Sequence, residues 1–181
     1  MAAIDIGSTA SDRTGTADSA NTYINKTNPA DGDGTITTVE IWADTELADC
    51  EVATFSEGAA NIMTSRDSEV VNNGNGAGVV LAGSKQTFTV DIDVVTGDYI
   101  GIKFSAGLLE YTNGSGDGRW YLGGDQIPCT DAEFTLGANR EVSLYGIGAT
   151  AAAFALEKFN AIVCTKWNEL AITKWNALSI P

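Results

Sequence analysis

Apolar and polar residues alternate in short runs between residues 21 and 147, and this pattern predicts β-strands. In the run 86–93, Phe88, Val90 and Ile92 fall on one face of an extended chain, while threonine and aspartate fall on the other. Stretches rich in glycine, asparagine and aspartate, which are typical of tight turns, separate the runs. The predicted strands are residues 21–26, 35–43, 50–56, 68–71, 86–93, 98–104, 108–111, 119–123 and 141–147.

The strand predicted at residues 35–43 also alternates, and strict alternation places Ile36 on the face opposite Val39 and Ile41. Short strands joined by tight turns suit an all-β fold, a two-layer β-sandwich. We expect a jelly-roll order of the strands, with an immunoglobulin-like order as the alternative. The pattern of runs alone does not fix which strands pair.

Composition divides the chain into four segments. Residues 1–19 are small and polar and predict an N-terminal arm that is flexible or becomes ordered against a partner. Residues 20–148 hold the predicted strands and form the sandwich domain. Residues 149–157 are rich in alanine and predict a linker with one or two helical turns. Residues 158–181 repeat one pattern of eight residues three times, as a short C-terminal β-repeat tail.

Each octapeptide repeat places lysine, an aromatic residue and asparagine before two apolar residues. A helix turns through about 800° in eight residues, so the aromatic residues would spiral around it. A strand keeps even spacings on one face, so short strands with bends at the lysine–aromatic–asparagine junctions fit the repeat. The residues that we expect to mediate assembly are Phe159, Ile162, Trp167, Leu170, Ile172, Trp175, Leu178 and Ile180.

Strands of about four residues from a single chain enclose almost no core. Other copies of the chain are therefore expected to close the core around the repeats. Three copies would form a rung of about 24 residues, similar to the roughly 20–29-residue repeats of single-chain solenoids. We expect a homo-oligomer, with a trimer favoured, and the alternative is a meander that folds onto the chain's own sandwich.

The chain has 181 residues, a formal net charge of −14 and no histidine. Residues 1–157 hold 7 Lys and Arg against 23 Asp and Glu, and so acidic a body repels the phosphates of nucleic acids. The lack of histidine removes the commonest general base and most zinc and copper sites. Two carboxylates can hydrolyse glycosides, but no pair stands out among the 24 acidic residues. We expect no catalytic residues and no enzymatic activity.

Residues 29–40 carry part of the spacing of a calcium-binding EF-hand loop, with Asp31 and Asp33 as candidate ligands. The first ligand position is Pro29, and a strand pattern follows where a helix is needed. A glycine-rich hairpin turn is therefore the favoured interpretation, and a calcium loop is the alternative. The sequence indicates no other cofactor.

Trp120 and Tyr121 lie beside a glycine-rich loop and form a candidate platform for stacking against a sugar. Adjacent residues of a strand face opposite ways, so we expect one of the two in the core and the other exposed.

Cys50 and Cys129 lack the spacing of a metal or thioredoxin-type site. They form a candidate disulfide, with buried free thiols as the alternative.

The start of the chain lacks the basic and apolar regions of a signal peptide. No stretch approaches the roughly 18 apolar residues of a membrane span, so we expect no membrane partner. We expect synthesis in the cytoplasm without a signal peptide. Action outside a cell would then need lysis or another route of release.

Five stretches of the body carry a resemblance: GTITTVEIWADTELADCEVATF, TSRDSEV, AGSKQTFTVDIDVVTGDYIGIKF, GDQIPCTDAEFTL and EVSLYGIGATAAA. With the Lys-Trp-Asn octapeptide repeats that follow, they resemble a group of poorly characterised β-sandwich structural proteins from tailed bacteriophages and environmental viral sequences. The resemblance implies a virion structural role, such as a head decoration, fibre or tail appendage, and it implies no catalysis.

We expect a non-enzymatic structural protein that self-assembles on a phage virion or in an extracellular filament, with the repeats mediating oligomerisation. Its partners would be itself and other virion or filament subunits. The alternative is a carbohydrate-binding β-sandwich module, stabilised by calcium if Asp31 and Asp33 hold the ion. In that case glycans are the partners. A carboxylate-based glycosidase is the third class.

Overall fold

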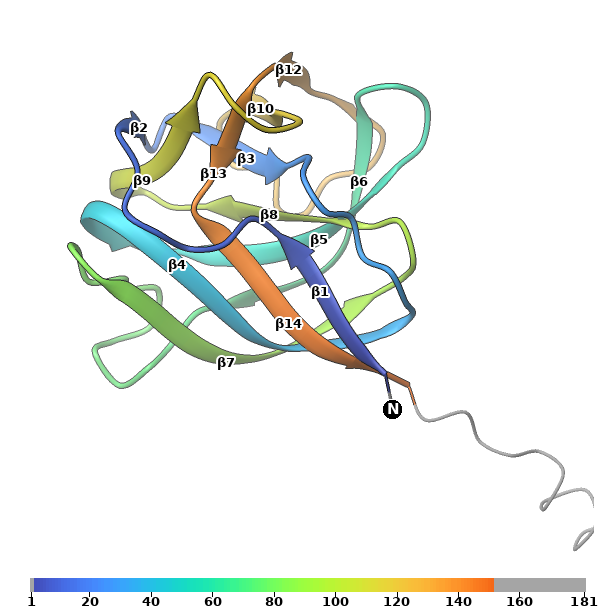
Figure 1. Cartoon of the computed structure of the whole chain (residues 1–181), viewed down its shortest axis with the longest axis horizontal. Helices are drawn as coiled ribbons and strands as arrows, with labels where there is room; N and C mark the ends of the chain where they lie inside the picture. The colour runs from blue at the N-terminus through green and yellow to red at the C-terminus, as the bar shows by residue number, and fades with distance from the viewer. Residues whose placement is uncertain (1, 152–181) are drawn as a thin grey trace, which may run out of the picture. The chain divides into compact units, whose positions relative to one another are not determined.

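The structure, a computed structural model, describes residues 2–151. These residues form fourteen β-strands and no helix, which confirms the predicted all-β class (Figure 1). In particular, the described residues hold no helix long and apolar enough to cross a membrane. The strands are β1 (Ala3–Gly7), β2 (Gly15–Ala17), β3 (Asn21–Asn25), β4 (Gly34–Ala48), β5 (Glu51–Glu57), β6 (Ile62–Val70), β7 (Lys85–Val94), β8 (Tyr99–Lys103), β9 (Ala106–Asn113), β10 (Arg119–Gly123), β11 (Ala132–Glu133), β12 (Thr135–Gly137), β13 (Arg140–Val142) and β14 (Leu144–Thr150).

The strands form two packed sheets, which confirms the predicted two-layer sandwich. The first sheet has the order β1-β14-β4-β9-β13, with β7 paired to β4 and β2 paired to β9. The second sheet has the order β11-β6-β5-β8-β3-β10-β12. β4 is long enough to pair with β14 and β7 along its first part and with β9 along its second part. It therefore links the two halves of the first sheet.

Eight of the strands follow the jelly-roll order. β1 pairs with β14, β3 with β8, β4 with β7, and β5 with β6, and all four pairings are antiparallel. Taken in sequence, these pairings join the first of the eight strands to the last, the second to the seventh, the third to the sixth and the fourth to the fifth. A long hairpin wound into two sheets has this pattern. The favoured jelly-roll order is confirmed, and the immunoglobulin-like alternative is not the one adopted.

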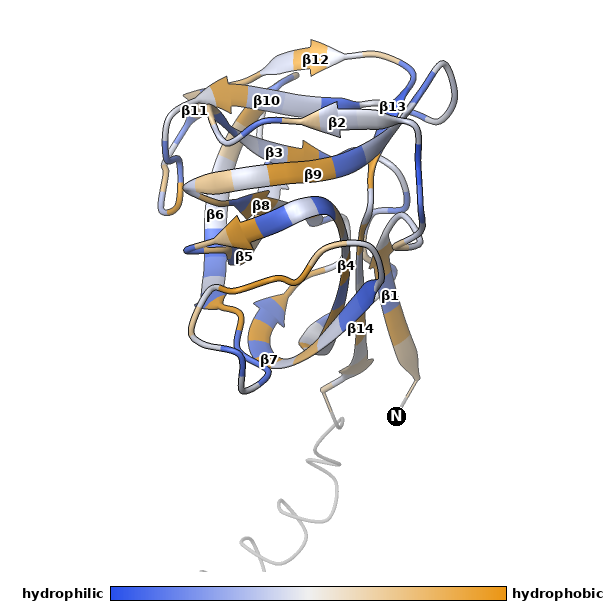
Figure 2. Ribbon diagram, turned by 90° about the vertical axis from the view of Figure 1, so that its left-hand side faces the viewer, coloured by the Kyte–Doolittle hydropathy of each residue, from blue (hydrophilic) through white to orange (hydrophobic). Residues whose placement is uncertain are grey.

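The connections between the eight strands alternate between the two ends of the sandwich (Figure 2). One end, here called the terminal end, holds Ala2, Thr150 and the turn that contains Asp33. Thr150 N donates a hydrogen bond to Ala2 O at 3.0 Å, and Ala151 N donates to Asp33 O at 3.1 Å. The opposite end, here called the insert end, holds residues 8–20 and the long insert 104–143. β9, β10, β12 and β13 of that insert extend both sheets.

The main core lies between the two sheets, and a second core lies on the outer face of the second sheet. β7 shows how the main core forms: Phe88, Val90 and Ile92 are all buried, as their alternation predicts. Residues 124–134 cover the outer face of the second sheet. The second core consists of Ile24, Ala53, Phe55, Met63, Trp120, Ile127 and Phe134.

The expectation of a flexible or partner-ordered arm at residues 1–19 is wrong. Ile4 and Ile6 are fully buried, and β1 pairs along its whole length with β14. Arg13 fixes the segment between β1 and β2, because its backbone N–H donates to the Glu110 carboxylate and its guanidinium pairs with Glu141 at 3.5 Å. Ile4 and Ile6 are two residues apart, so both point into the core from one face of β1.

A β-bulge in β4 accounts for a second difference between the structure and the prediction. The register of β4 shifts between Ile36 and Thr38 against both of its neighbours. One extra residue reverses the alternation at that point, so Ile36, Val39 and Ile41 are all fully buried on the same side. Strict alternation from the sequence had placed Ile36 opposite the other two.

The predicted alanine-rich linker begins too early, because Ala149 and Thr150 belong to β14. Pairing with both β1 and β4 holds these residues in the first sheet. The rest of the predicted linker and the repeats of residues 158–181 lie outside the described residues.

Candidate ligand-binding site

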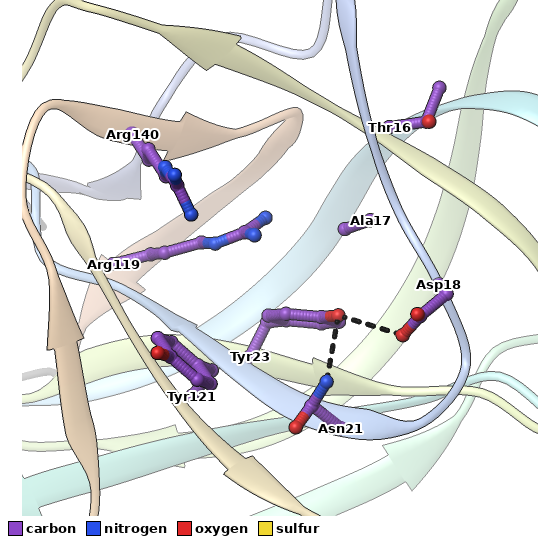
Figure 3. Close-up of a pocket in the computed structure, with 8 residues that line it drawn as sticks. All are labelled: Thr16, Ala17, Asp18, Asn21, Tyr23, Arg119, Tyr121 and Arg140. Atoms are coloured by element: carbon purple, nitrogen blue, oxygen red, sulfur yellow. Dashed lines mark hydrogen bonds between the residues drawn. The ribbon is translucent and has the colours of Figure 1, made fainter.

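A pocket of about 260 Å³ opens between the two sheets at the insert end (Figure 3). β2 and β13 of the first sheet supply one side, and β3 and β10 of the second sheet supply the other. The lining residues are Thr16, Ala17, Asp18, Asn21, Tyr23, Arg119, Tyr121 and Arg140. Most of the lining therefore comes from the segment after β1 and from the insert, and of the eight jelly-roll strands only β3 contributes.

Strand pairing explains why three of the lining side chains meet. Arg119 and Tyr121 are two residues apart on β10 and so share one face of the second sheet. Tyr121 lies directly opposite Tyr23 of β3. Directly opposite residues of an antiparallel pair project to the same side. The two tyrosines and the arginine therefore face the gap between the sheets.

Arg119 has the most unusual surroundings in the pocket. Its guanidinium carbon lies 4.6 Å from the ring centroid of Tyr23 and 4.1 Å from that of Tyr111, so it packs against two aromatic rings. The residue is only 6% exposed, and Nε and Nη1 are buried without a hydrogen-bond partner among the described residues. Burial lowers the pKa of this guanidinium, and the neighbouring charge of Arg140 lowers it further. Both effects are those of a cation that lacks a counterion.

Arg140 adds a second positive charge to the same pocket and lies 5.7 Å from the Tyr111 ring centroid. Neither arginine is among the ion pairs of residues 2–151, which are Arg13–Glu141, Arg66–Asp98 and Lys85–Glu40. Residues 1–157 contain more than three times as many acidic as basic residues. Two adjacent arginines without a carboxylate partner are therefore notable in this part of the chain.

The other side of the pocket is polar. Asn21 Nδ2 donates a hydrogen bond to the Tyr23 hydroxyl at 3.2 Å, and that hydroxyl donates to Asp18 Oδ1 at 3.2 Å (Figure 3). Burial raises the pKa of Tyr23, so the phenol stays neutral and keeps its proton. Asp18 Oδ1 also accepts from Ala20 N at 3.0 Å, which fixes the turn between β2 and β3.

Comparison with family models and with curated proteins gives no match to this chain. The chemistry of the pocket must therefore be argued from its own residues. A fixed, buried cation without a counterion, a second cation, a half-buried tyrosine and a polar rim together suit a small polar anion.

Trp120 is not part of this pocket, so its assignment to a sugar-stacking platform is wrong. It is fully buried in the second core, on the opposite face of β10 from Tyr121. Its Nε1 donates to Asn61 Oδ1 at 2.7 Å, and its ring meets the edge of Tyr99 with centroids 4.9 Å apart. The expectation that the two residues face opposite ways is confirmed, but Tyr121 is half-buried against the main core and not exposed.

Asp31 and Asp33 belong to the turn before β4 at the terminal end, where Ala151 N donates to Asp33 O, and neither lines the pocket. Asp33 Oδ1 accepts hydrogen bonds from Thr96 N and Thr96 Oγ1, both at 2.7 Å. These two bonds lower the pKa of Asp33. Residues 2–151 hold no group of three or more acidic or cysteine side chains that could bind a metal ion. The Asp33 side chain therefore joins the turn before β4 to the turn after β7.

Cys50 and Cys129 are both free, so the candidate disulfide is not formed. Cys50 is fully buried in the main core, whereas Cys129 is half-buried beside the second core. The second sheet separates these two cores, which keeps the sulfurs apart. Burial raises the pKa of each thiol.

The assembly residues proposed from the repeats lie outside the described residues. They are Phe159, Ile162, Trp167, Leu170, Ile172, Trp175, Leu178 and Ile180.

Sequence reasoning found Tyr121 but missed Arg119, Arg140 and Tyr23. One signal was available for Arg119, because the predicted strand 119–123 places it two residues before Tyr121 and hence on the same face. The scarcity of basic residues was a second signal. Nothing in the sequence indicated that β3 or β13 would complete the pocket, because their positions depend on the strand order.

Proposed function

We propose that this chain is a non-enzymatic structural protein that self-assembles through its C-terminal repeats and displays the sandwich as a binding module. The assembly would be a phage virion, as a decoration, fibre or tail appendage, or an extracellular filament. Three copies would share the core formed by the repeats.

The observation that carries this proposal is that the end of the described chain and the pocket lie at opposite ends of the sandwich. Ala151, which precedes the segment with the repeats, is held at the terminal end by the backbone of Asp33. The pocket around Arg119 is lined by residues of β2, β3, β10 and β13 at the insert end. A domain attached at one end and hollowed at the other suits display from an assembly. A catalytic role would have no support from histidine, because the sequence contains none.

The repeats support the assembly role by their chemistry. Each carries an aromatic residue and a pair of apolar positions at even spacing, yet one chain with eight-residue steps cannot enclose them. Apolar surface left in water costs about 25 cal/mol for each Å². Association of several copies removes that cost, which is how repeat segments gain stability.

The test compares the intact chain with a chain truncated after Glu157, by light scattering and electron microscopy. We expect the intact chain to form a regular oligomer with three times the monomer mass, or a fibre built from that unit. The truncated chain should keep the circular dichroism spectrum of the sandwich but remain a monomer. If the truncated chain builds the same oligomer, the contacts lie on the sandwich and the proposal is wrong.

Point variants distinguish the loss of the apolar contacts of the repeats from the general effect of removing the segment. Leu170→Asp with Leu178→Asp should abolish assembly, because each carboxylate would enter a closing apolar core. The matched control is Ala171→Asp with Ser179→Asp, which adds the same charge at odd positions on the opposite strand face. The control should assemble as the intact chain does. Equal loss in both variants would contradict the strand model of the repeats.

A second candidate function is carbohydrate binding, and the half-buried Tyr121 in a pocket with polar side chains favours it. Aromatic rings beside polar groups are typical of sugar sites. The two roles are compatible, because the repeats serve assembly and the pocket would serve binding. Glycans would then be the ligands of the displayed end.

A further inference from the structure

We propose that the pocket at the insert end binds an acidic sugar, with Arg119 receiving the sugar carboxylate. The inference deepens the carbohydrate-binding role named above and rests on it. Arg140 adds attraction for the anion, and Tyr121 with Asn21 contacts the rest of the sugar.

The first argument is the state of the Arg119 guanidinium. The rings of Tyr23 and Tyr111 pack against it, and its Nε and Nη1 have no acceptor among the described residues. A buried cation without a counterion is destabilising, and an anion bound in the pocket offsets that penalty by pairing with the charge of the guanidinium. The rings also hold the guanidinium in place, so little conformational entropy is lost when an anion binds.

The second argument concerns the kind of anion. Planar guanidinium groups match carboxylates and phosphates through paired hydrogen bonds. Asp18 lies on the far side of the same pocket and carries a negative charge of its own. It would repel a doubly charged phosphate or a second acidic group. A single carboxylate directed at Arg119 carries half the charge of such a phosphate and so meets less repulsion.

The third argument concerns the rest of the ligand. The volume of about 260 Å³ is below the roughly 300–1,000 Å³ of drug-sized sites, so the pocket suits one sugar unit. Thr16, Asn21 and Asp18 offer donors and acceptors for hydroxyl groups, and Tyr121 offers part of a ring face. A molecule with one carboxylate and several hydroxyls is a uronic acid or a related acidic sugar.

The experiment is calorimetric titration of the full-length chain with sodium glucuronate. The neutral methyl ester of glucuronic acid, glucose and sodium sulfate serve as comparison ligands. We expect glucuronate to bind at least about tenfold more tightly than the ester, because the ester cannot form the charge-assisted pair. Sulfate should bind more weakly than glucuronate, because it lacks the hydroxyl groups.

Variants assign the interaction to residues. Arg119→Gln should weaken glucuronate binding at least about tenfold, and Arg140→Gln should weaken it less, because Arg140 acts at a distance. Lys85→Gln removes the same charge outside the pocket and should leave binding unchanged. Circular dichroism and thermal melting check the fold of each variant. If Arg119→Gln does not fold, the test is the weaker glucuronate binding expected for Arg140→Gln.

Several outcomes would overturn the inference. No binding of glucuronate would remove the ligand class, and equal binding of the ester would remove the role of Arg119. Sulfate bound as tightly as glucuronate would reduce the site to a simple anion site. The titration is repeated on Leu170→Asp with Leu178→Asp, which tests assembly separately. Binding without assembly would contradict the repeat model alone, and assembly without binding would contradict the pocket alone.

Discussion

The guanidinium of Arg66 and the carboxylate of Asp98 form an ion pair with two hydrogen bonds. Arg66 Nε donates to Asp98 Oδ2 at 2.5 Å, and Nη2 donates to Oδ1 at 3.0 Å. The Asp98 side chain is only 3% exposed, and its Oδ2 also accepts from Val95 N at 2.9 Å. The pair therefore ties β6 of the second sheet to the turn between β7 and β8.

We expect Arg66→Ala to lower the free energy of unfolding by about 1–3 kcal/mol, because it leaves a buried carboxylate without its charged donor. Urea denaturation measures the change. The comparison is Lys85→Ala, which breaks the more exposed pair with Glu40 and should cost no more than about 1 kcal/mol. Equal losses in the two variants would show that the burial of Asp98 does not matter.

The two neighbours on β10 should respond differently to substitution. Trp120→Phe removes the hydrogen bond to Asn61 and leaves a small void, so it should destabilise the fold by about 1–3 kcal/mol. It should leave glucuronate binding unchanged. Tyr121→Ala should weaken that binding with a smaller effect on stability, because the side chain is half-buried. Thermal melting and calorimetric titration measure the two effects, and the reverse pattern would place the wrong residue in the pocket.

Most of the longer strands of the body could be predicted from the sequence, because burial on one face imposes alternation. β7 is the clearest case, since its buried residues are those that the alternation selects. The run 68–71 covers only the end of β6, however, and the run 141–147 spans the break between β13 and β14. The bulge at Ile36 leaves only a break in the alternation, with Ile36 three residues before Val39, and that break alone does not distinguish a bulge from an apolar residue on the other face. β1 was missed for another reason: two isoleucines in a polar segment are a weak signal until β14 is known to lie beside them.

The pocket depends on contacts between residues distant in sequence, and for this reason only Tyr121 could be predicted. Tyr23 and Arg119 are brought together by the pairing of β3 with β10, across almost a hundred residues of chain. Conversely, Asp31 and Asp33 have a suggestive local spacing, yet Asp33 is held by Thr96 from another turn. The local spacing of Asp31 and Asp33 thus did not predict the site, whereas alternation along β10 places Arg119 on the same face as Tyr121.

The stability contributed by Asp33 should depend on pH. The folded state lowers the pKa of Asp33 from its ordinary value of 3.8, because Thr96 donates two hydrogen bonds to the carboxylate. The contribution is therefore present above pH 3.8 and is lost as the pH falls through the lowered pKa. We expect Asp33→Asn to melt at a lower temperature than the wild type at neutral pH and at the same temperature in strong acid.

The control for that measurement is Asp31→Asn. Asp31 makes no side-chain hydrogen bond to the described residues, so this variant should melt as the wild type does at both pH values. A difference for Asp33→Asn that persists in strong acid would show that the charge is not the cause.

Cys50 and Cys129, the two cysteines of residues 2–151, should differ in reactivity. Cys129 is half-buried, whereas Cys50 is fully buried and the pKa of its thiol is raised more strongly by burial. We expect iodoacetamide to label Cys129 in the native protein and to label Cys50 only after unfolding, as measured by mass spectrometry of peptides. A reductant should leave the melting temperature unchanged. A linked peptide of the two cysteines in unreduced digests would contradict the structure.

The pairing of β14 with β1 and β4 has a mechanical consequence. β14 runs from the insert end, where it follows the pocket strand β13, to Thr150 and Ala151 at the terminal end. Tension between a ligand held at Arg119 and an attachment beyond Ala151 would act along the axis of β14. Antiparallel hydrogen bonds lie perpendicular to their strands, so the bonds on both sides of β14 would be loaded together in shear instead of opening one by one. A sandwich pulled in this direction should rupture only at high force, whereas a pull across the sheet at Ala2 would peel β1 away first.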